Sequence, residues 1–188
     1  MELKKILEKR HCSRKFRAKK VGWNDLSLIL DSARYAPCAG GIFTIKLIVV
    51  DNDEKKKKLA EAALGQSFIA EAPYIIIVCS DMERIKSSYG NFAEKYASQQ
   101  AGAAIENMFL KATELGLSTC WIGTFDENAI KRIMHIPDKA KVEALLPVGY
   151  EMEKSFIKEK ISLKRIVRFN DWENKELVGW KTKATSKE

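Results

Sequence analysis

The chain has 188 residues, of which 46% are hydrophobic and 31% are charged. This length and balance suit one compact folded domain and exclude an intrinsically disordered chain. No apolar run approaches the roughly 20 residues that a membrane-spanning helix needs, and residues 1–10 alternate charged and apolar side chains, unlike a signal peptide, so we expect a cytoplasmic protein with no membrane partner.

The formal net charge of +8 allows two interpretations. A basic surface can bind nucleic acid, or lysines such as the run Lys55–Lys58 can simply form a solvated face. We favour the solvated face and predict no nucleic-acid partner, because the basic residues are scattered and no nucleic-acid-binding motif is present.

The cysteines and histidines do not indicate a metal site. The four cysteines, Cys12, Cys38, Cys79 and Cys120, include no CxxC pair, and the two histidines lie far apart in the sequence. Zinc sites and thioredoxin-type dithiols normally show such close pairs. We therefore predict no bound metal.

The first half of the chain predicts helices separated by a small-residue loop. Residues 2–10 indicate a short helix, and apolar side chains recur at i, i+3, i+4 and i+7 from Leu26, which indicates a second one. Pro37 should end that helix, since proline restricts the preceding residue and cannot donate a helix hydrogen bond. Residues 38–41 then form a loop, and Ile45–Val50 is predicted to be a buried strand.

The remaining elements follow from apolar spacing and from capping residues. A stripe of small and apolar residues from Ala97 to Leu115 predicts a long helix that Gly116 caps. Its smooth surface favours a central position or a subunit contact. The other elements expected are a helix at 53–64, strands at Tyr74–Cys79, Ser118–Ile122 and Val142–Val148, and a short helix at 126–134.

Helices and strands interleave without a regular series of equal βα units, which favours an α+β fold. No GxGxxG follows a strand and no GxxxxGK[ST] occurs, so neither a dinucleotide-binding fold nor a P-loop is indicated. We predict a single domain over residues 1–188. After Tyr150 the chain becomes polar with spaced apolar anchors, and we expect residues 151–188 to form a C-terminal extension that embraces a partner subunit.

The segment Arg10–Phe16 is rich in hydrogen-bond donors. In an extended chain alternate side chains share a face, so Arg10, Cys12 and Arg14 would point the same way. Two converging guanidinium groups suit a phosphate, because each can bind two oxygens. A basic helix end whose cations complement the helix dipole is the alternative, and this segment alone leaves both open.

Three further segments could contact a ligand. The small residues of 36–41 would let a flat ligand approach the backbone closely. The segment 119–125 contains a strand that ends in Gly123, where backbone N–H groups become exposed, and a lysine in the tail segment 158–163 could complete a phosphate site. An ordinary turn, a core strand and a solvated tail are the respective alternatives.

Taken in order, these segments resemble the FMN-dependent nitroreductase family over residues 5–172. The family pattern R-R-S-x-R-x-F reads R-H-C-S-R-K-F here, and A-P-S-A-x-N-x-Q-P-W reads A-P-C-A-G-G-I-F-T-I. The family's L-G-L-G-T-C-W-I-G is close to L-G-L-S-T-C-W-I-G in this chain, and L-L-P-V-G-Y matches the family's closing strand.

The resemblance implies a central, mostly antiparallel sheet flanked by helices, in an intertwined homodimer that holds FMN at its interface. It also implies three groups of FMN-binding residues. These are Arg10, His11, Cys12, Arg14 and Lys160 at the phosphate and ribityl chain, Pro37, Cys38, Ala39 and Gly41 along the flavin from the partner subunit, and Ile122 and Gly123 near flavin N5.

Some positions depart from the family pattern. Cys12 and Cys38 stand where serines are usual, and Gly41 replaces an asparagine that commonly binds the flavin ring. Gln100 occupies a position where aspartate is common, and Phe43-Thr44-Ile45 replaces Q-P-W. These differences bear on FMN affinity and on the shape of the substrate pocket.

From this resemblance we expect an FMN-dependent oxidoreductase that works by a ping-pong mechanism. NADH or NADPH would deliver hydride to flavin N5, and a small organic acceptor, such as a nitroaromatic, a quinone or a flavin, would then take the electrons. No side chain need act as a nucleophile. The predicted substrate-lining residues are Phe43, Gln66, Tyr89 and Phe92. The alternative is a non-catalytic flavin carrier or sensor on the same fold.

Overall fold

Four antiparallel strands form one sheet in the order β1-β2-β4-β3. The structure is a computed structural model that describes residues 2–153 and 159–175. The strands are β1 (Ile45–Val50), β2 (Tyr74–Asp81), β3 (Ser118–Thr119) and β4 (Ala140–Gly149). The predicted α+β class, with an antiparallel sheet flanked by helices, is confirmed.

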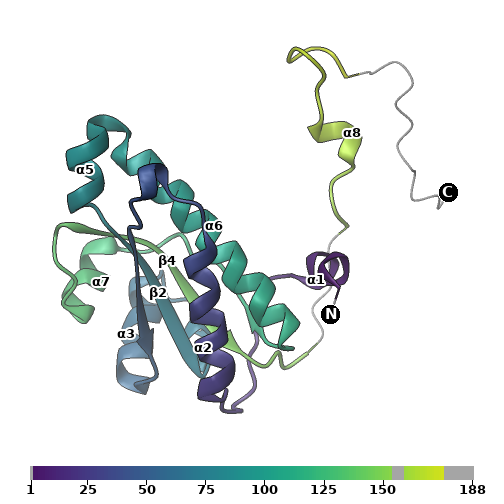
Figure 1. The fold of residues 1–188 in the computed structure, drawn as a ribbon. Coiled ribbons are helices and arrows are strands. Elements are labelled where there is room, and N and C mark those ends of the chain that lie inside the picture. Colours follow the sequence, from purple (N-terminus) through teal and green to yellow (C-terminus); the bar gives the residue numbers. More distant parts are fainter. Residues whose placement is uncertain (1, 154–158, 176–188) are drawn as a thin grey trace. The chain divides into compact units, whose positions relative to one another are not determined.

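Helices cover both faces of this sheet (Figure 1). One layer contains α2 (Trp23–Ser32) and α6 (Ala93–Glu114), and the other contains α3 (Asp53–Ala62), α4 (Phe68–Glu71) and α7 (Glu127–Met134). The other helical segments of the described chain are α1 (Leu3–Lys9), α5 (Glu83–Tyr89), α8 (Leu163–Ile166) and three 3-10 turns, η1 (Ala33–Tyr35), η2 (Ala39–Gly41) and η3 (Gly90–Phe92).

The central strand β2 separates two hydrophobic cores. Ile76 and Val78 pack with α2 and α6, whereas Ile75 and Ile77 pack with α3 and α7. All four side chains are fully buried. This alternation follows from the two-residue repeat of a strand, and it explains why the sequence of β2 is apolar throughout.

Capping groups fix the ends of the main helices. The Asn52 side chain accepts a hydrogen bond from Lys55 N at the start of α3, and Asp126 does the same for Ala129 N at the start of α7. Gly116 has a positive φ of 75° just after α6, and Leu117 N donates to Ala112 O at 2.8 Å. This is the Schellman arrangement that glycine favours, as the sequence indicated.

A β-bulge interrupts the pairing of β2 with β4. Val142 lies opposite Cys79 and Ala144 opposite Val78, so Glu143 is an extra residue on β4. The Glu143 carboxylate accepts a hydrogen bond from Ser98 Oγ of α6 at 3.0 Å, and Lys141 Nζ lies 3.7 Å from it. The bulge therefore turns a carboxylate from the sheet toward α6.

The third strand is shorter than the predicted Ser118–Ile122, and Pro147 supplies the reason. Ser118 pairs with Gly149, and pairing in the same register resumes only where Ile122 meets Leu145. This register sets Cys120 opposite Pro147. Leu145 N donates to Ile122 O at 3.0 Å. An N–H at position 147, two residues further along β4, would likewise point toward β3. Proline has no N–H, so the ladder breaks at Cys120.

The chain divides into two units, residues 1–155 and 156–188. The first contains the whole sheet, whereas the role of residues 151–188 as an extension over a partner stays a prediction. Within the described part of the second unit, α8 is its helix, and Phe169 N donates to Asn174 O at 2.9 Å. No helix among the described residues of either unit is long and apolar enough to cross a membrane.

Candidate functional site

The segment that follows α1 runs beside the ends of β3 and β4. Cys12 forms a parallel bridge with Thr119, and Ser13 N donates to Thr119 O at 2.9 Å. Four residues on, the buried Phe16 pairs with Glu151. The predicted extended segment is thus held along the sheet edge, and Ser13 and Phe16, three residues apart, are buried.

Two guanidinium groups and two thiols meet at this edge. The Arg10 side chain lies close enough to Cys12, and Arg14 close enough to Cys120, to lower the thiol pKa, and the two thiols also act on each other. Arg10 Nε also lies 3.2 Å from a carboxylate oxygen of Glu106 on α6. The structure therefore brings Arg10, Cys12 and Arg14 together, as the extended pattern indicated, and adds Cys120, which sequence reasoning had not assigned to the site.

Electrostatics separate the two thiols. Cys120 donates its hydrogen bond to Cys12, and Arg10 adds positive charge nearby, so the pKa of Cys12 falls to about 5 although burial opposes the shift. The same contact, together with burial, raises the pKa of Cys120 well above its usual range. The shifts favour the thiolate form at Cys12 rather than at Cys120, with Arg10 and Arg14 beside the pair.

His11 makes its hydrogen bonds with residues outside this cluster. Its Nδ1 lies 2.8 Å from Lys9 O, and its Nε2 lies 2.9 Å from Glu151 Oε1. Both partners are acceptors, so both ring nitrogens carry hydrogen when both bonds form. Although partial burial opposes the charge, the Lys9 carbonyl and the Glu151 carboxylate raise the pKa of His11 overall. In this arrangement His11 fixes the segment in place.

The predicted flavin-lining turn lies between Pro37 and the start of β1. Residues 39–41 form η2, and Gly40 takes a positive φ of 54°. A Cβ at Gly40 would collide with the Tyr89 hydroxyl, whereas one at Gly41 would meet nothing within 4 Å. Glycine is thus required where Tyr89 packs on the turn, and the exposed Gly41 leaves the backbone open to a ligand.

Two of the predicted substrate-lining residues form an aromatic cluster beside this turn. Tyr89 meets Tyr96 edge-on with ring centres 5.1 Å apart, and Phe92 stacks on Tyr96 at 6.1 Å. Tyr96 was missed from the sequence, although the positions 89, 92 and 96 have helical spacing. Phe92 is 61% exposed, so the cluster presents an aromatic face to solvent, and its substrate role stays a prediction.

The other two predicted substrate residues lie elsewhere. Phe43, which is 41% exposed, borders a surface hollow with Leu30 and Leu47. Gln66 lies in the turn between α3 and α4, where its Nε2 donates to Ala63 O at 2.8 Å. These contacts do not join Phe43 or Gln66 to the aromatic cluster, and their substrate role stays a prediction.

The end of β3 presents Trp121 and Gly123 to solvent. Ile122 is buried and paired with Leu145, whereas Trp121 is 42% exposed and meets Phe109 edge-on at 6.2 Å. The indole also lies against Gly102 of α6 and near Gly123. A Cβ at position 102 would lie 4.0 Å from the indole, an ordinary contact, so Trp121 does not by itself require glycine there. Lys160 belongs to the second unit, where it is exposed, and its FMN contact stays a prediction.

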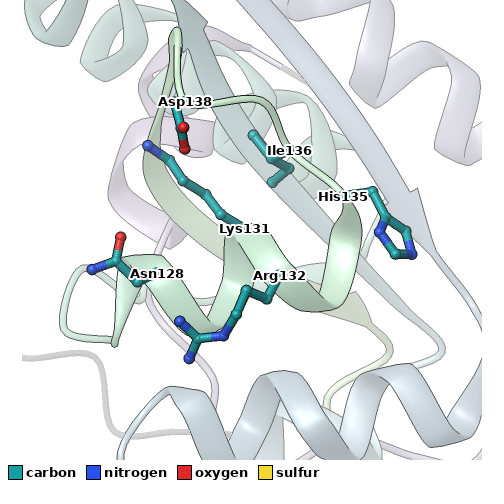
Figure 2. A pocket seen from close by; sticks show the side chains of 6 residues that line it. All are labelled: Asn128, Lys131, Arg132, His135, Ile136 and Asp138. Carbon is teal, nitrogen blue, oxygen red and sulfur yellow. The ribbon is translucent and has the colours of Figure 1, made fainter.

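A separate hollow at the end of α7 contains no predicted site residue (Figure 2). Lys131 and Asp138 extend toward each other there, while Arg132 and His135 point in other directions. Lys131 Nζ lies 3.0 Å from Glu127 Oε1. The mixture of charges does not converge on one ligand, so this hollow is a less suitable site than the turn at Arg10–Arg14.

These elements define a class of protein, an α+β fold with a cationic turn at one sheet edge. The sequence pattern of the Nitroreductase family matches residues 7–68 and 62–150, and the chain belongs to this family of oxidoreductases.

Relatives cover most of this chain. An NADH dehydrogenase of Thermus thermophilus is 27% identical over 195 residues, which covers 89% of this chain and 95% of that protein. A Methanocaldococcus jannaschii protein named as a nitroreductase is 36% identical over 107 residues, 57% of this chain and 53% of that protein. The aligned part thus spans about half the length of that second relative.

Solved structures share the fold. The structure of NfrA2 from B. megaterium has a TM-score of 0.85 at 24% identity and covers 92% of this chain and 76% of that one. An FMN-dependent nitroreductase from Clostridium difficile has a TM-score of 0.77 at 28% identity and covers 89% of this chain and 98% of that one.

Proposed function

We propose that this chain is an FMN-dependent NAD(P)H oxidoreductase that reduces a small organic acceptor in a ping-pong cycle. The observation that carries the proposal is the cluster of Arg10, Cys12 and Arg14 at the end of β3, in a member of the nitroreductase family. An FMN reductase [NAD(P)H] of Bacillus subtilis, 24% identical over 174 residues, supports the choice of cofactor.

The residues at the cluster fit the phosphate end of FMN. Two guanidinium groups carry permanent positive charge in planar forks that match phosphate oxygens. Arg14 is exposed, and Glu106 orients Arg10 from α6. Cys12 is exposed between them, and its thiolate would have to be protonated or displaced outward when a phosphate binds. We expect Lys160 to add a further positive charge.

The other predicted site residues would contact different parts of the bound cofactor and substrate. Bound FMN would supply the ability to accept a hydride and pass electrons on. Gly123 and the buried Ile122 would fix the ring edge near N5, and the turn of Pro37, Cys38, Ala39 and Gly41 would line the flavin from the partner subunit. NAD(P)H and the acceptor, a nitroaromatic, a quinone or a flavin, would occupy one face in turn, beside Tyr89 and Phe92.

The proposal requires a homodimer, in which residues 151–188 extend over the partner. The exposed apolar side chains of the first unit support this, since Trp23, Leu28 and Tyr35 are 64%, 48% and 76% exposed on α2 and η1. Such side chains on one region of a protein commonly mark an interface.

The visible spectrum of the purified protein tests the cofactor. We expect a yellow protein whose flavin absorbance is bleached anaerobically by NADH or NADPH and restored by an acceptor. A yellow protein that neither nucleotide bleaches would favour the flavin carrier or sensor. A colourless protein that does not bind added FMN would contradict the proposal.

A double substitution tests the phosphate site. Arg10→Ala with Arg14→Ala should release FMN, because both permanent charges beside the phosphate are lost, and flavin content per chain measures the effect. Arg132→Ala, which removes an exposed arginine on α7, is the matched control and should keep its FMN. Unchanged flavin content in a folded double variant would show that the phosphate binds elsewhere.

A further inference from the structure

Cys12 and Cys120 belong to two segments that the backbone holds side by side. Cys12 bridges Thr119 in parallel, and Ser13 N donates to Thr119 O at 2.9 Å. Neighbouring strands lie about 4.8 Å apart with a rise of about 3.3 Å per residue, so a residue one step past the bridge partner has its Cα about 6 Å away. Disulfides join Cα atoms about 4.4–6.8 Å apart.

The side chains agree with this spacing, because the two thiols lie close enough for each to shift the pKa of the other. The break in the ladder at Pro147 adds freedom at the right place. Cys120 lies opposite the residue that has no N–H to donate, so its backbone is not fixed by a hydrogen-bonded pair with β4. A small adjustment at Cys120 can therefore bring the sulfur atoms to bonding distance.

We propose that Cys12 and Cys120 are a peroxide-sensitive pair that forms a disulfide between the Arg10–Arg14 turn and the end of β3. The FMN phosphate assignment makes this a modification within the cofactor site, and that link rests on the proposed function. Formation of the bond itself does not rest on it.

Exposure gives the two thiols different roles. Cys12 is exposed and Cys120 is 2% exposed, so a peroxide from solvent reaches Cys12 first. The hydrogen bond from Cys120, with the nearby charge of Arg10, lowers the pKa of Cys12, and the thiolate is the form that attacks. Cys120 is then the resolving thiol, shielded from solvent and adjacent to one sulfur.

The chemistry balances with hydrogen peroxide as the oxidant. The Cys12 thiolate attacks one peroxide oxygen and the O–O bond breaks, which gives a sulfenic acid and hydroxide. The Cys120 sulfur then attacks the Cys12 sulfur, the S–O bond breaks, and the hydroxyl leaves as water with the proton from Cys120. In sum, two thiols and one peroxide give a disulfide and two waters, and Arg14 favours ionisation of Cys120 during the second step.

The other cysteines serve as internal controls. Cys79 is buried in the core of β2, where burial raises its pKa to about 12, so it should not react. Cys38 follows Pro37 in the predicted flavin-lining turn and is partly exposed. In protein freed of FMN, Cys38→Ser should therefore leave disulfide formation unchanged.

The test treats the full-length protein with one equivalent of hydrogen peroxide, quenches with catalase, and alkylates the remaining thiols before peptide mapping. We expect the Cys12–Cys120 cross-linked peptide in wild type and in Cys38→Ser, the loss of two titratable thiols, and full recovery with dithiothreitol. Cys12→Ser and Cys120→Ala should form no cross-link. Because Cys120 is buried and its variant could misfold, the wild-type peptide map is the deciding measurement.

Two outcomes overturn the proposal. One is a Cys12 that ends as sulfinic acid while Cys120 stays a free thiol, and the other is a pair that remains reduced at a peroxide dose that oxidises glutathione. Saturating FMN separates this result from the proposed function. If FMN binds at the turn, it should cover Cys12 and slow the cross-link several-fold. A cross-link that forms equally fast with FMN would leave the disulfide intact and contradict the phosphate assignment.

Discussion

His11 is held between two acceptors, the Lys9 carbonyl and the Glu151 carboxylate. The arrangement is fully satisfied when the imidazole is protonated, because only then do both ring nitrogens donate. His11 thus connects the end of α1 to Glu151, two residues after β4, through a charged hydrogen bond whose strength depends on pH.

We predict that this contribution to stability is lost as the pH rises. The pKa of His11 is raised in the folded protein above its ordinary 6.5. The stabilisation is therefore fully present below that value and disappears as the pH rises through the folded-state pKa. Urea unfolding of wild type and His11→Gln should differ more at about pH 5.5 than at about pH 8.5. An equal difference at both would show that His11 is not charged here.

Gln100 orders the entrance of β1 from within α6. Its Oε1 accepts hydrogen bonds from Thr44 N at 2.8 Å and from Thr44 Oγ1 at 2.7 Å. Both residues are buried. The Gln100 Nε2 atom is buried without a hydrogen-bond partner in the described chain, so the acceptor end of this amide accounts for its stabilising contacts.

We predict that Gln100→Leu destabilises the fold by about 1–3 kcal/mol, because the buried Thr44 N–H and hydroxyl lose their acceptor. Thr44→Val removes the hydroxyl and keeps the backbone bond, so it should have the smaller effect. Chemical denaturation of the three proteins measures this order. A Gln100→Leu protein as stable as wild type would mean that relief of the buried Nε2 outweighs the lost bonds.

At the scale of single residues, the sequence indicated part of the cluster. Alternation in an extended segment predicted that Arg10, Cys12 and Arg14 share a face. Cys120 could not be added in the same way, because its approach to Cys12 depends on a bridge between segments far apart in the chain. The role of His11 in fixing the turn likewise depends on Glu151, which no local pattern connects to it.

The short β3 is an element whose length one proline sets. Where Pro147 faces Cys120, the ladder between β3 and β4 is interrupted, and it resumes at Ile122. Apolar spacing predicted a strand through Ile122, because side chains continue to alternate across the gap. A missing N–H on the opposite strand leaves no trace in the sequence of the strand that it shortens.

We predict that Pro147→Ala extends β3 by supplying the missing donor. The new amide should bond the Cys120 carbonyl and exchange slowly with solvent, whereas the same substitution at Pro137, outside the sheet, should give a faster-exchanging amide. Hydrogen exchange by NMR reports on both positions. Rapid exchange at residue 147 would show that another feature, such as the position of Trp121, separates the strands.

Elements marked by a clear apolar run or by a capping residue were predicted best. The strand Ile45–Val50 has the predicted bounds, and the helix expected at 126–134 begins one residue later. The short α4 and α5 were not predicted, because helices of four and seven residues depend on packing more than on their own sequence. Strand order was not predicted, since apolar runs do not specify their partners and the family resemblance implied only a mostly antiparallel sheet.

At the scale of the whole molecule, the proposed dimer would bury the exposed apolar side chains of α2 and η1. Leu28 and Tyr35 are seven residues apart, on one side of α2 and η1, and both are exposed. We predict that Leu28→Glu with Tyr35→Glu halves the mass found by light scattering and lowers FMN content, because the partner lines the flavin. Leu64→Glu, an exposed leucine after α3, should change neither. A wild-type monomer that retains FMN would contradict the shared site.

The fold as a whole was predictable in class, and its site was predictable in part. Two cores on opposite faces of β2 follow from an apolar strand that must be covered on both sides. The role of residues 156–188 in a dimer does not follow from the spacing of their apolar side chains. Such side chains can pack on any apolar surface within reach.

The extra residue on β4 lets the strand place a carboxylate beside α6 without changing which apolar side chains face each core. With Glu143 in place, Val142 and Leu145 pack in one core although they are three positions apart, and Ala144 packs in the other. A shorter strand without position 143 would keep every apolar neighbour on its present side. The insertion thus serves the contacts of Glu143 with Ser98 and Lys141, and neither interior depends on it.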